Sequence, residues 1–245
     1  SSNKTEYGIV KIDGSVKQPG SFRIVKGETI FDLIKKSGGL KKNAFMRGLV
    51  FSRDEEKLRE KKSILRLQKE LDKGIISALE TTTKSGLDPT SIVALKELSK
   101  TASSYEPIGR VVGDFDSVEI LKSIILKPGD SIYIPSRPTS VSVVGEVMTP
   151  GSILWNKKYK IENYINISAG LTQQADKKKI FIISPNGKAQ RSSGLWSSMS
   201  KILPGSTIVI PRKIQLASNI EKASSISSVI YQITLSLAGL DSILE

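Results

Sequence analysis

One stretch of this chain occurs twice, and the two copies are related by a constant offset of 131 positions. Gly14 matches Gly145 at this offset, and the register continues without a gap for about 30 residues. Further identical pairs are Val16/Val147, Pro19/Pro150, Gly20/Gly151, Ser21/Ser152, Ile30/Ile161, Ile34/Ile165, Ser37/Ser168, Gly39/Gly170, Leu40/Leu171 and Ala44/Ala175. An internal repeat of this length predicts two copies of one structural unit, in tandem.

Each copy begins with the pattern of a β-hairpin. Residues 7–16 alternate polar and apolar, which is typical of a half-buried strand, and residues 22–25 form the returning strand. Between them, Pro19-Gly20 and its counterpart Pro150-Gly151 predict a type II turn with the glycine at positive φ. We interpret these four residues as turn residues and not as a phosphate site, since no Lys-Ser/Thr pair follows the glycines.

A short helix follows each hairpin and ends at a glycine, over residues 28–39 and 161–170. Each copy then closes with Pro-Gly-x-x-Ile-x-Ile-Pro, at 128–135 and 204–211. These closing strands are only 76 positions apart, so the first copy contains about 55 additional residues.

The additional residues have the pattern of a helical hairpin, at about 53–104. Apolar residues at helical spacing predict a long charged helix from about Asp54 to Thr82. Asp88-Pro89, an N-cap followed by proline, opens a second helix. The hairpin is either a solvated decoration or a contact with a neighbouring subunit or a preceding domain. The predicted parts are therefore residues 7–136 with this insert, residues 139–213, and a tail. Residues 136–139 are too few for a flexible linker.

The tail, residues 217–245, has the pattern of an amphipathic helix. From Ala223 to Leu240 it contains no charged residue. One face is apolar (Ile226, Val229, Ile230, Ile233, Leu237 and Leu240) and the other is polar (Ser225, Ser228, Gln232 and Ser236). Two readings stay open. A ring of such helices could cross a membrane with apolar stripes toward lipid and polar stripes toward a lumen. Alternatively, the stripe packs on the body of its own protein.

The composition limits the kinds of catalytic and binding chemistry that we expect of this chain. The chain has no cysteine and no histidine, which leaves out thiol chemistry, the common metal ligands and the usual general base. No carboxylate pair suggests a glycosidase, so we expect no catalytic residues, metal or cofactor. The net charge is +13, without the interleaved aromatic residues that stack bases, so nucleic acid is not expected. Lys157, Lys158, Lys177 and Lys178 are either solvated or contact an acidic polymer.

The repeated Gly-x-Val-x-x-Pro-Gly-Ser hairpin, the helix ending in Gly-Leu and the closing strand resemble the soluble-ligand-binding β-grasp (SLBB) domain. Two such domains followed by an amphipathic helix resemble the Wza-like outer-membrane polysaccharide export proteins. The resemblance implies an α+β fold of two tandem β-grasp domains. It also implies a homo-oligomeric ring in the periplasm and outer membrane of a Gram-negative bacterium, which passes a polysaccharide and docks on an inner-membrane copolymerase.

The export domain and the lipid-bearing cysteine that precede these repeats in that group are not in this sequence, which indicates part of a longer protein. We also expect no targeting peptide in the sequence given. The alternative function is a soluble periplasmic β-grasp module that binds a small ligand or saccharide without forming a pore.

Overall fold

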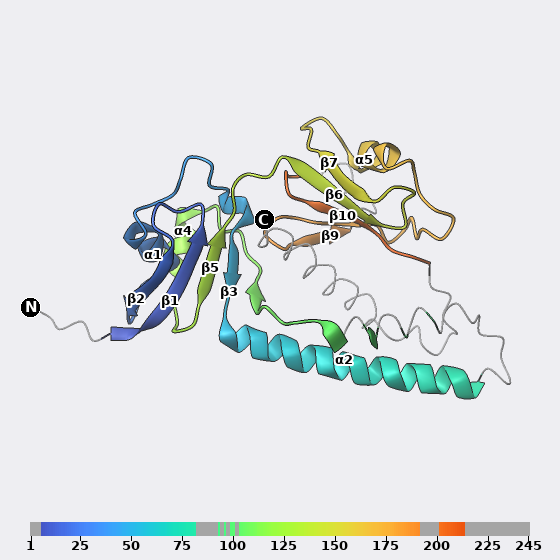
Figure 1. Ribbon diagram of the computed structural model, residues 1–245, viewed down its shortest axis with the longest axis horizontal. Helices are drawn as coiled ribbons and strands as arrows, with labels where there is room; N and C mark the ends of the chain where they lie inside the picture. Colours follow the sequence, from blue (N-terminus) through green and yellow to red (C-terminus); the bar gives the residue numbers. More distant parts are fainter. Residues whose placement is uncertain are drawn as a thin grey trace, which may run out of the picture.

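The structure is a computed structural model that describes residues 6–81, 93, 96, 99, 100, 103–191 and 201–213. It contains two five-stranded sheets that lie side by side, and a long helix that leaves the first (Figure 1). The fold is α+β, as predicted. The predicted helix over 217–245, with both of its faces, and the start of the insert's second helix at Asp88 lie outside the described residues.

The first sheet has the strand order β2-β1-β5-β3-β4. Its central pair, β1 and β5, is parallel, and the remaining neighbours are antiparallel. The strands are β1 (Glu6–Gly14), β2 (Gly20–Val25), β3 (Val50–Ser52), β4 (Arg110–Val111) and β5 (Ser131–Ile134). Two short helices, α1 (Ile30–Lys36) and α4 (Val118–Ser123), pack on one face of this sheet, and a 3-10 turn, η1 (Met46–Gly48), precedes β3.

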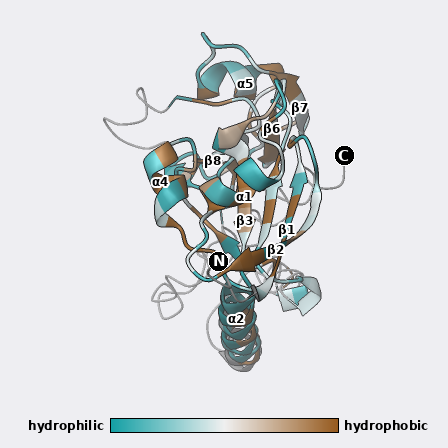
Figure 2. Ribbon diagram, turned by 90° about the vertical axis from the view of Figure 1, so that its left-hand side faces the viewer, coloured by the Kyte–Doolittle hydropathy of each residue, from teal (hydrophilic) through white to brown (hydrophobic). Residues whose placement is uncertain are grey.

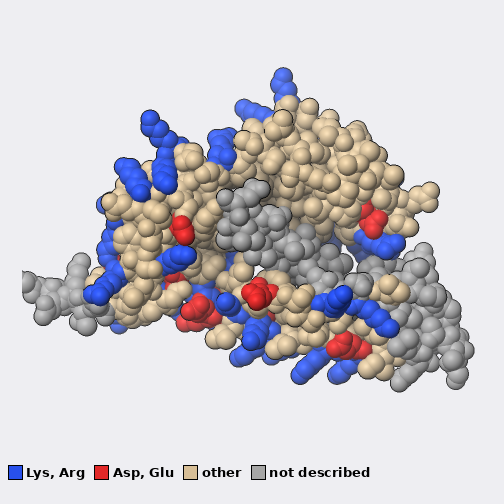
Figure 3. Space-filling view, in the orientation of Figure 1, with Lys and Arg blue, Asp and Glu red and all other residues tan. Residues whose placement is uncertain are grey.

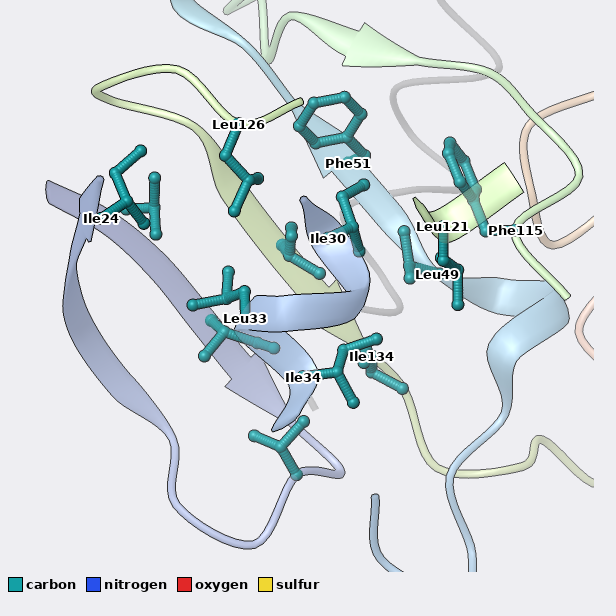
Figure 4. Close-up of a cluster of buried hydrophobic side chains, with 14 residues drawn as sticks. Ile24, Ile30, Leu33, Ile34, Leu49, Phe51, Phe115, Leu121, Leu126 and Ile134 are labelled. Carbon is teal, nitrogen blue, oxygen red and sulfur yellow. The ribbon is translucent and has the colours of Figure 1, made fainter. Parts of the chain in front are cut away.

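The core of the first unit lies between this sheet face and the helices (Figure 4). Ile12, Ile30 and Ile132 have no exposed surface, and Phe51 packs edge-on against Phe115. Alternate residues of β1 and β5 point into this cluster, which explains the polar–apolar alternation in the sequence.

The second sheet repeats the first, with the order β7-β6-β10-β8-β9. Its strands are β6 (Ser140–Gly145), β7 (Gly151–Leu154), β8 (Phe181–Ile183), β9 (Ala189–Arg191) and β10 (Thr207–Ile210). The helix α5 (Ile161–Ile167) covers its core face, where Tyr164 is fully buried. β6 and β10 form the parallel pair that corresponds to β1 and β5.

The match extends to single hydrogen bonds. The Lys17 amide donates to the Gly39 carbonyl at 2.9 Å, and Met148 donates to Gly170 at 3.0 Å. The isolated bridge between Val16 and Leu40 likewise recurs between Val147 and Leu171. The predicted repeat is therefore confirmed in backbone geometry.

Both predicted short helices, α1 and α5, end at a glycine with positive φ, but the residue before that glycine differs between the two units. Gly38 and Gly39 have φ of 77° and 89° after α1. After α5 the same two positions are Ala169, with φ of 60°, and Gly170, with φ of 88°. Among the described residues, Ala169 is the only one other than glycine with positive φ. At the other end of α1, the Thr29 hydroxyl lowers the pKa of Asp32 through the capping box that they form.

The predicted type II turn is wrong. Gly20, with φ of 151°, and Gly151 are the first residues of β2 and β7, and Pro19 and Pro150 immediately precede them. The left-handed glycines are instead Gly14 (φ 85°) and Gly145 (φ 92°), at the ends of β1 and β6. A Cβ at Gly14 would collide with the Ile134 carbonyl, and one at Gly145 with that of Ile210. These glycines allow close approach of two parallel strands.

The insert begins with α2 (Asp54–Thr81), close to the predicted bounds. Its apolar residues Ile64, Leu71 and Ile75 are buried. The chain returns along it: the Ser99 hydroxyl donates to Asp72 at 2.8 Å, and the Gly109 amide and the Tyr105 hydroxyl both donate to Glu60. The remaining surface of α2 is largely hydrophilic (Figure 2). Within the described ranges, no helix is both long and apolar enough to span a bilayer.

Two further differences concern element bounds. The sequence of residues 110–115 predicts one further strand after the insert, but β4 is only two residues long, and α4 was not predicted. Ser117 caps α4 by accepting a hydrogen bond from the Ile120 amide. Six residues are too few to show helical periodicity, so only this cap could have indicated α4.

Candidate functional site

The two units meet at a junction formed by residues 110–114 of the first and the turn 185–188 of the second. Arg110 donates from Nη2 to the Pro185 carbonyl at 2.6 Å. Asn186 donates from Nδ2 to the Gly113 carbonyl at 3.2 Å and to Asp114 at 3.1 Å. Lys188 forms an ion pair of 2.5 Å with Asp114. Four polar contacts therefore supplement the short linker and restrict the relative motion of the units.

The junction turn is tight against the first unit. A Cβ added at Gly187 would lie 3.1 Å from Arg110 Nε and 3.3 Å from a methyl of Val112. Gly187 also has φ of 86°, which suits the β8–β9 hairpin. In the first unit, the matching β3–β4 connection contains the helical insert. The same connection is thus a long projection in one copy and a docking turn in the other.

An ion pair joins the insert to the first sheet. Arg53, which precedes α2, donates to both carboxylate oxygens of Asp130, and the Asp130 side chain has no exposed surface. These hydrogen bonds raise the pKa of the Arg53 guanidinium. Asp130 also accepts the Lys127 amide at 2.9 Å. The charge of Asp130 is therefore compensated, and the base of α2 has a fixed position.

A second matched site shows how the copies have diverged in charge. In the first unit, the hydroxyls of Ser15 and Ser136 lie 2.9 Å apart. The same places in the second unit contain Glu146 and Arg212, whose charged atoms are 3.7 Å apart. Thr172 donates its hydroxyl to Glu146 at 2.6 Å.

Positive charge is concentrated in the second unit. Residues 139–213 contain 11 Lys and Arg against 3 Asp and Glu, a net charge of +8 out of +13. The insert, residues 54–109, contains 10 of each and is neutral. Figure 3 shows one face of the molecule, on which many cations project from the first unit and α2, while much of the second unit is uncharged.

The four predicted lysine contacts do not form one cluster. Lys157 and Lys158 follow Trp155, whose amide donates to Thr139 at the beginning of β6. Lys177 and Lys178 follow Asp176, whose amide donates to Pro211 just beyond the end of β10. Because β6 and β10 are parallel, the two lysine pairs lie at opposite ends of the sheet. All four are exposed.

No group of three or more Asp or Glu that could bind a metal is present among the described residues. The acidic residues reported above are instead paired with cations, hydroxyls or backbone amides. The features that stand out are the polar junction between the two units and the cationic excess of the second unit.

Two segments, residues 9–57 and 140–191, match the model of the SLBB domain. They begin at β1 and β6 and extend through β3 and β9, respectively. Each repeated unit is therefore similar to the SLBB domain over its matched segment, and we refer to the two units below as the first and second SLBB domains. The helical insert begins within the last residues matched in the first SLBB domain and continues beyond them.

The chain is also similar to two proteins of Escherichia coli, both named polysialic acid transport protein KpsD. The identities are 29% and 28% over 171 residues, 70% of this chain and 29% of each relative. The chain thus spans less than a third of the length of these curated relatives. Both relatives are, by name, transport proteins.

The junction residues were missed by sequence reasoning. The pair Asn186-Gly187 is typical of a tight hairpin turn in the sequence, and the antiparallel pairing of β8 and β9 confirms this turn. However, no periodicity indicates that the side chains of this turn contact the other SLBB domain. In the first SLBB domain, Arg110 and Asp114 follow the insert, where the chain re-enters the sheet. Their position indicates a contact with the second SLBB domain only when the structure is known.

Proposed function

We propose that this chain is part of a protein that exports polysaccharide across the outer membrane of a Gram-negative bacterium, and that it performs no catalysis. The similarity to KpsD, which covers 70% of the chain, is the observation that carries this proposal. We take residues 7–136 and 139–213 as its two SLBB domains and residues 217–245 as the tail.

The protein forms a homo-oligomeric ring in this proposal. A closed ring requires subunits whose domains keep a constant relative angle, since small angular differences accumulate around the ring. The junction between residues 110–114 and 185–188 supports such a fixed angle. The helical insert, which projects along the molecule, is available to contact a neighbouring subunit or a preceding domain.

The transported polymer is acidic in this proposal. A net charge of +8 on the second SLBB domain attracts an anionic chain over distances of about 8–10 Å at physiological salt. Lys157, Lys158, Lys177 and Lys178 are its contacts. Because these pairs lie at opposite ends of the sheet, an extended polymer can touch both at once, whereas a small ligand cannot.

The tails complete the channel. Six residues (Ile226, Val229, Ile230, Ile233, Leu237 and Leu240) face lipid, and Ser225, Ser228, Gln232 and Ser236 face the lumen. Polar groups that line a wide pore make weak contacts at many positions, which lets a polymer slide. An inner-membrane polysaccharide copolymerase docks on the periplasmic side and delivers the polymer.

The alternative is a soluble periplasmic module that binds a small ligand and forms no pore. The two functions differ in assembly, so the full-length protein should be extracted from membranes in detergent and imaged as single particles. A closed ring supports export, and a monomer contradicts it. Deletion from Ser218 onward should abolish membrane association and polymer export if the first function is correct, and should change little if the alternative is correct.

A further inference from the structure

The face of the second sheet that lies opposite α5 is apolar where its counterpart in the first sheet is polar. Ile208 and Ile210 belong to the core under α5, so Val209 points to the opposite face. Val209 pairs laterally with Val144 on β6 and Phe181 on β8, which gives one apolar row across three strands. A second row contains Ser142, Thr207 and Ile183.

The repeat provides the comparison. Val144, Ile183 and Val209 occupy the places of Asp13, Ser52 and Tyr133 in the first sheet. The polar residues of the first sheet are suited to water, whereas the three apolar residues of the second are not. We call Val144, Phe181, Ile183 and Val209 the outer apolar face. Phe181 is the exception in this comparison, because its counterpart Val50 is also apolar and is 3% exposed.

Part of the outer apolar face is buried, whereas its residues Val144 and Phe181 are half-buried. Val209 is 4% exposed and Ile183 is 3% exposed, although neither belongs to the core cluster under α5. The junction with the first SLBB domain reaches this sheet at the turn 185–188, beyond the end of β8. Val209 lies one strand further in, on the central strand β10.

We propose that the tail of the same chain docks on the outer apolar face, with its stripe of Ile226, Val229, Ile230, Ile233, Leu237 and Leu240 against Val144, Phe181 and Val209. The chemistry is complementary, because the tail is uncharged from Ala223 to Leu240 and the two rows contain no charged residue on β6, β10 and β8. Arg191 on the edge strand β9 pairs with Phe181 and ends the apolar row. The tail also starts in the right place, since it follows β10 directly.

The dimensions agree with this placement. Residues 214–225 can span at most about 40 Å when extended, which is enough to turn from the end of β10 onto its own sheet. From Ile226 to Leu240 a helix is about 21 Å long. Five strands at about 4.8 Å spacing give a sheet about 19 Å wide.

The tail can lie either on the second sheet or in a membrane, but not in both places at once. The stripe that contacts the sheet is the stripe that would face lipid, so a docked tail cannot be inserted in a membrane. The tail is stored on the second SLBB domain in water and is released at the membrane. Storage follows from the outer apolar face alone, whereas release rests on the proposed function.

The absence of native cysteine allows a direct test, because a single introduced cysteine is then the sole thiol. Val209→Cys reports on the outer apolar face, and Tyr133→Cys is its matched control in the first sheet. In the full chain, in water, maleimide should label Val209→Cys about tenfold more slowly than Tyr133→Cys, since a covered thiol reacts only after local opening.

The tail is then changed in two matched ways. Ile230→Asp with Ile233→Asp places two charges on the stripe, and Ser228→Asp with Gln232→Asp places two on the polar face. The stripe pair should accelerate labelling of Val209→Cys about tenfold, and the polar-face pair by no more than about twofold. Neither should alter Tyr133→Cys. Val144→Cys is the second reporter, in case Val209→Cys does not fold.

Rapid labelling of both reporters with the native tail would overturn the inference, and so would protection that is unchanged when the stripe carries the two aspartates. Protection that disappears on dilution would also overturn it, because the covering segment would then belong to a second copy of the chain. Flotation with vesicles of phosphatidylethanolamine and phosphatidylglycerol separates this inference from the proposed function. Slow labelling in water without vesicle binding would retain docking and contradict membrane insertion.

Discussion

The guanidinium of Arg53 donates two hydrogen bonds to the buried carboxylate of Asp130, from Nε at 2.9 Å and from Nη2 at 2.8 Å. This pair connects the residue before α2 to the loop before β5. The matched positions in the second SLBB domain are Ser184 and Ser206, where the Ser206 hydroxyl accepts the Leu203 amide as Asp130 accepts that of Lys127. The ion pair is thus found in the SLBB domain that contains the helical insert, and serines take its place in the other.

Replacing Arg53 with Met should strongly destabilise the first SLBB domain. The change leaves Asp130 buried without its cation, a situation that costs about 3–5 kcal/mol. Chemical denaturation followed by circular dichroism measures the loss. The double variant Arg53→Ser with Asp130→Ser copies the second SLBB domain and removes both charges. It should be clearly more stable than Arg53→Met; equal instability would show that the ion pair does not dominate at this site.

Ala169→Gly should stabilise the second SLBB domain by about 0.5–1 kcal/mol. Ala169 has φ of 60°, which is unfavourable for a residue with a Cβ. Both tryptophans of the chain, Trp155 and Trp196, lie in the sequence of the second SLBB domain, so their fluorescence during denaturation reports its stability.

The first SLBB domain provides the reverse experiment. Gly38→Ala creates the alanine found at position 169, and its Cβ would lie 3.3 Å from that of Lys17. We expect a destabilisation of about 1 kcal/mol or more. If Ala169→Gly lowered stability, or if Gly38→Ala had no effect, the backbone explanation would be wrong.

Loosening the junction should change domain motion more than stability. Lys188 and Asp114 are about half exposed, so their ion pair contributes no more than about 1 kcal/mol. Asn186→Ala with Lys188→Gln should nevertheless widen the distance distribution between spin labels at Lys26→Cys and Lys157→Cys. The control Lys11→Gln removes an exposed pair with Asp13 inside the first SLBB domain and should leave the distribution unchanged. An unaltered distribution in the junction variant would contradict a fixed angle set by these contacts.

Charge removal tests the polymer contacts. Lys157→Gln with Lys158→Gln, and Lys177→Gln with Lys178→Gln, should each weaken binding of an acidic polysaccharide, and should weaken the dependence of binding on salt. Lys61→Gln with Lys62→Gln on α2 changes the net charge equally. If this control weakened binding as much as the other two variants, overall charge and not the second SLBB domain would be responsible.

Much of the fold could be predicted from the repeat, because its glycines and apolar residues recur at matched places. The difference between the offsets 131 and 76 also located the insert. Local propensity did not indicate which glycine is essential: Gly14 is required by the approach of β5, a strand distant in sequence. The predicted type II turn was wrong because the prediction considered only the local Pro-Gly pair and not the packing of β5 against Gly14.

The site was less predictable than the fold. Lys157 and Lys177 look alike in sequence, and only the parallel pairing of β6 and β10 shows that they lie at opposite ends. The contacts of Asn186 and Lys188 depend on how two SLBB domains meet, which periodicity within one domain does not determine. The outer apolar face became visible only once the structure paired Val209 with Val144 on one side and with Phe181 on the other.

The central claim is export, and the most direct measurement is the amount of polysaccharide on the surface of cells from which this protein has been deleted. The account predicts that surface polysaccharide is lost, that polymer accumulates inside the envelope, and that the intact protein restores the surface polymer. Normal surface polysaccharide in the deleted cells, without internal accumulation, would contradict it.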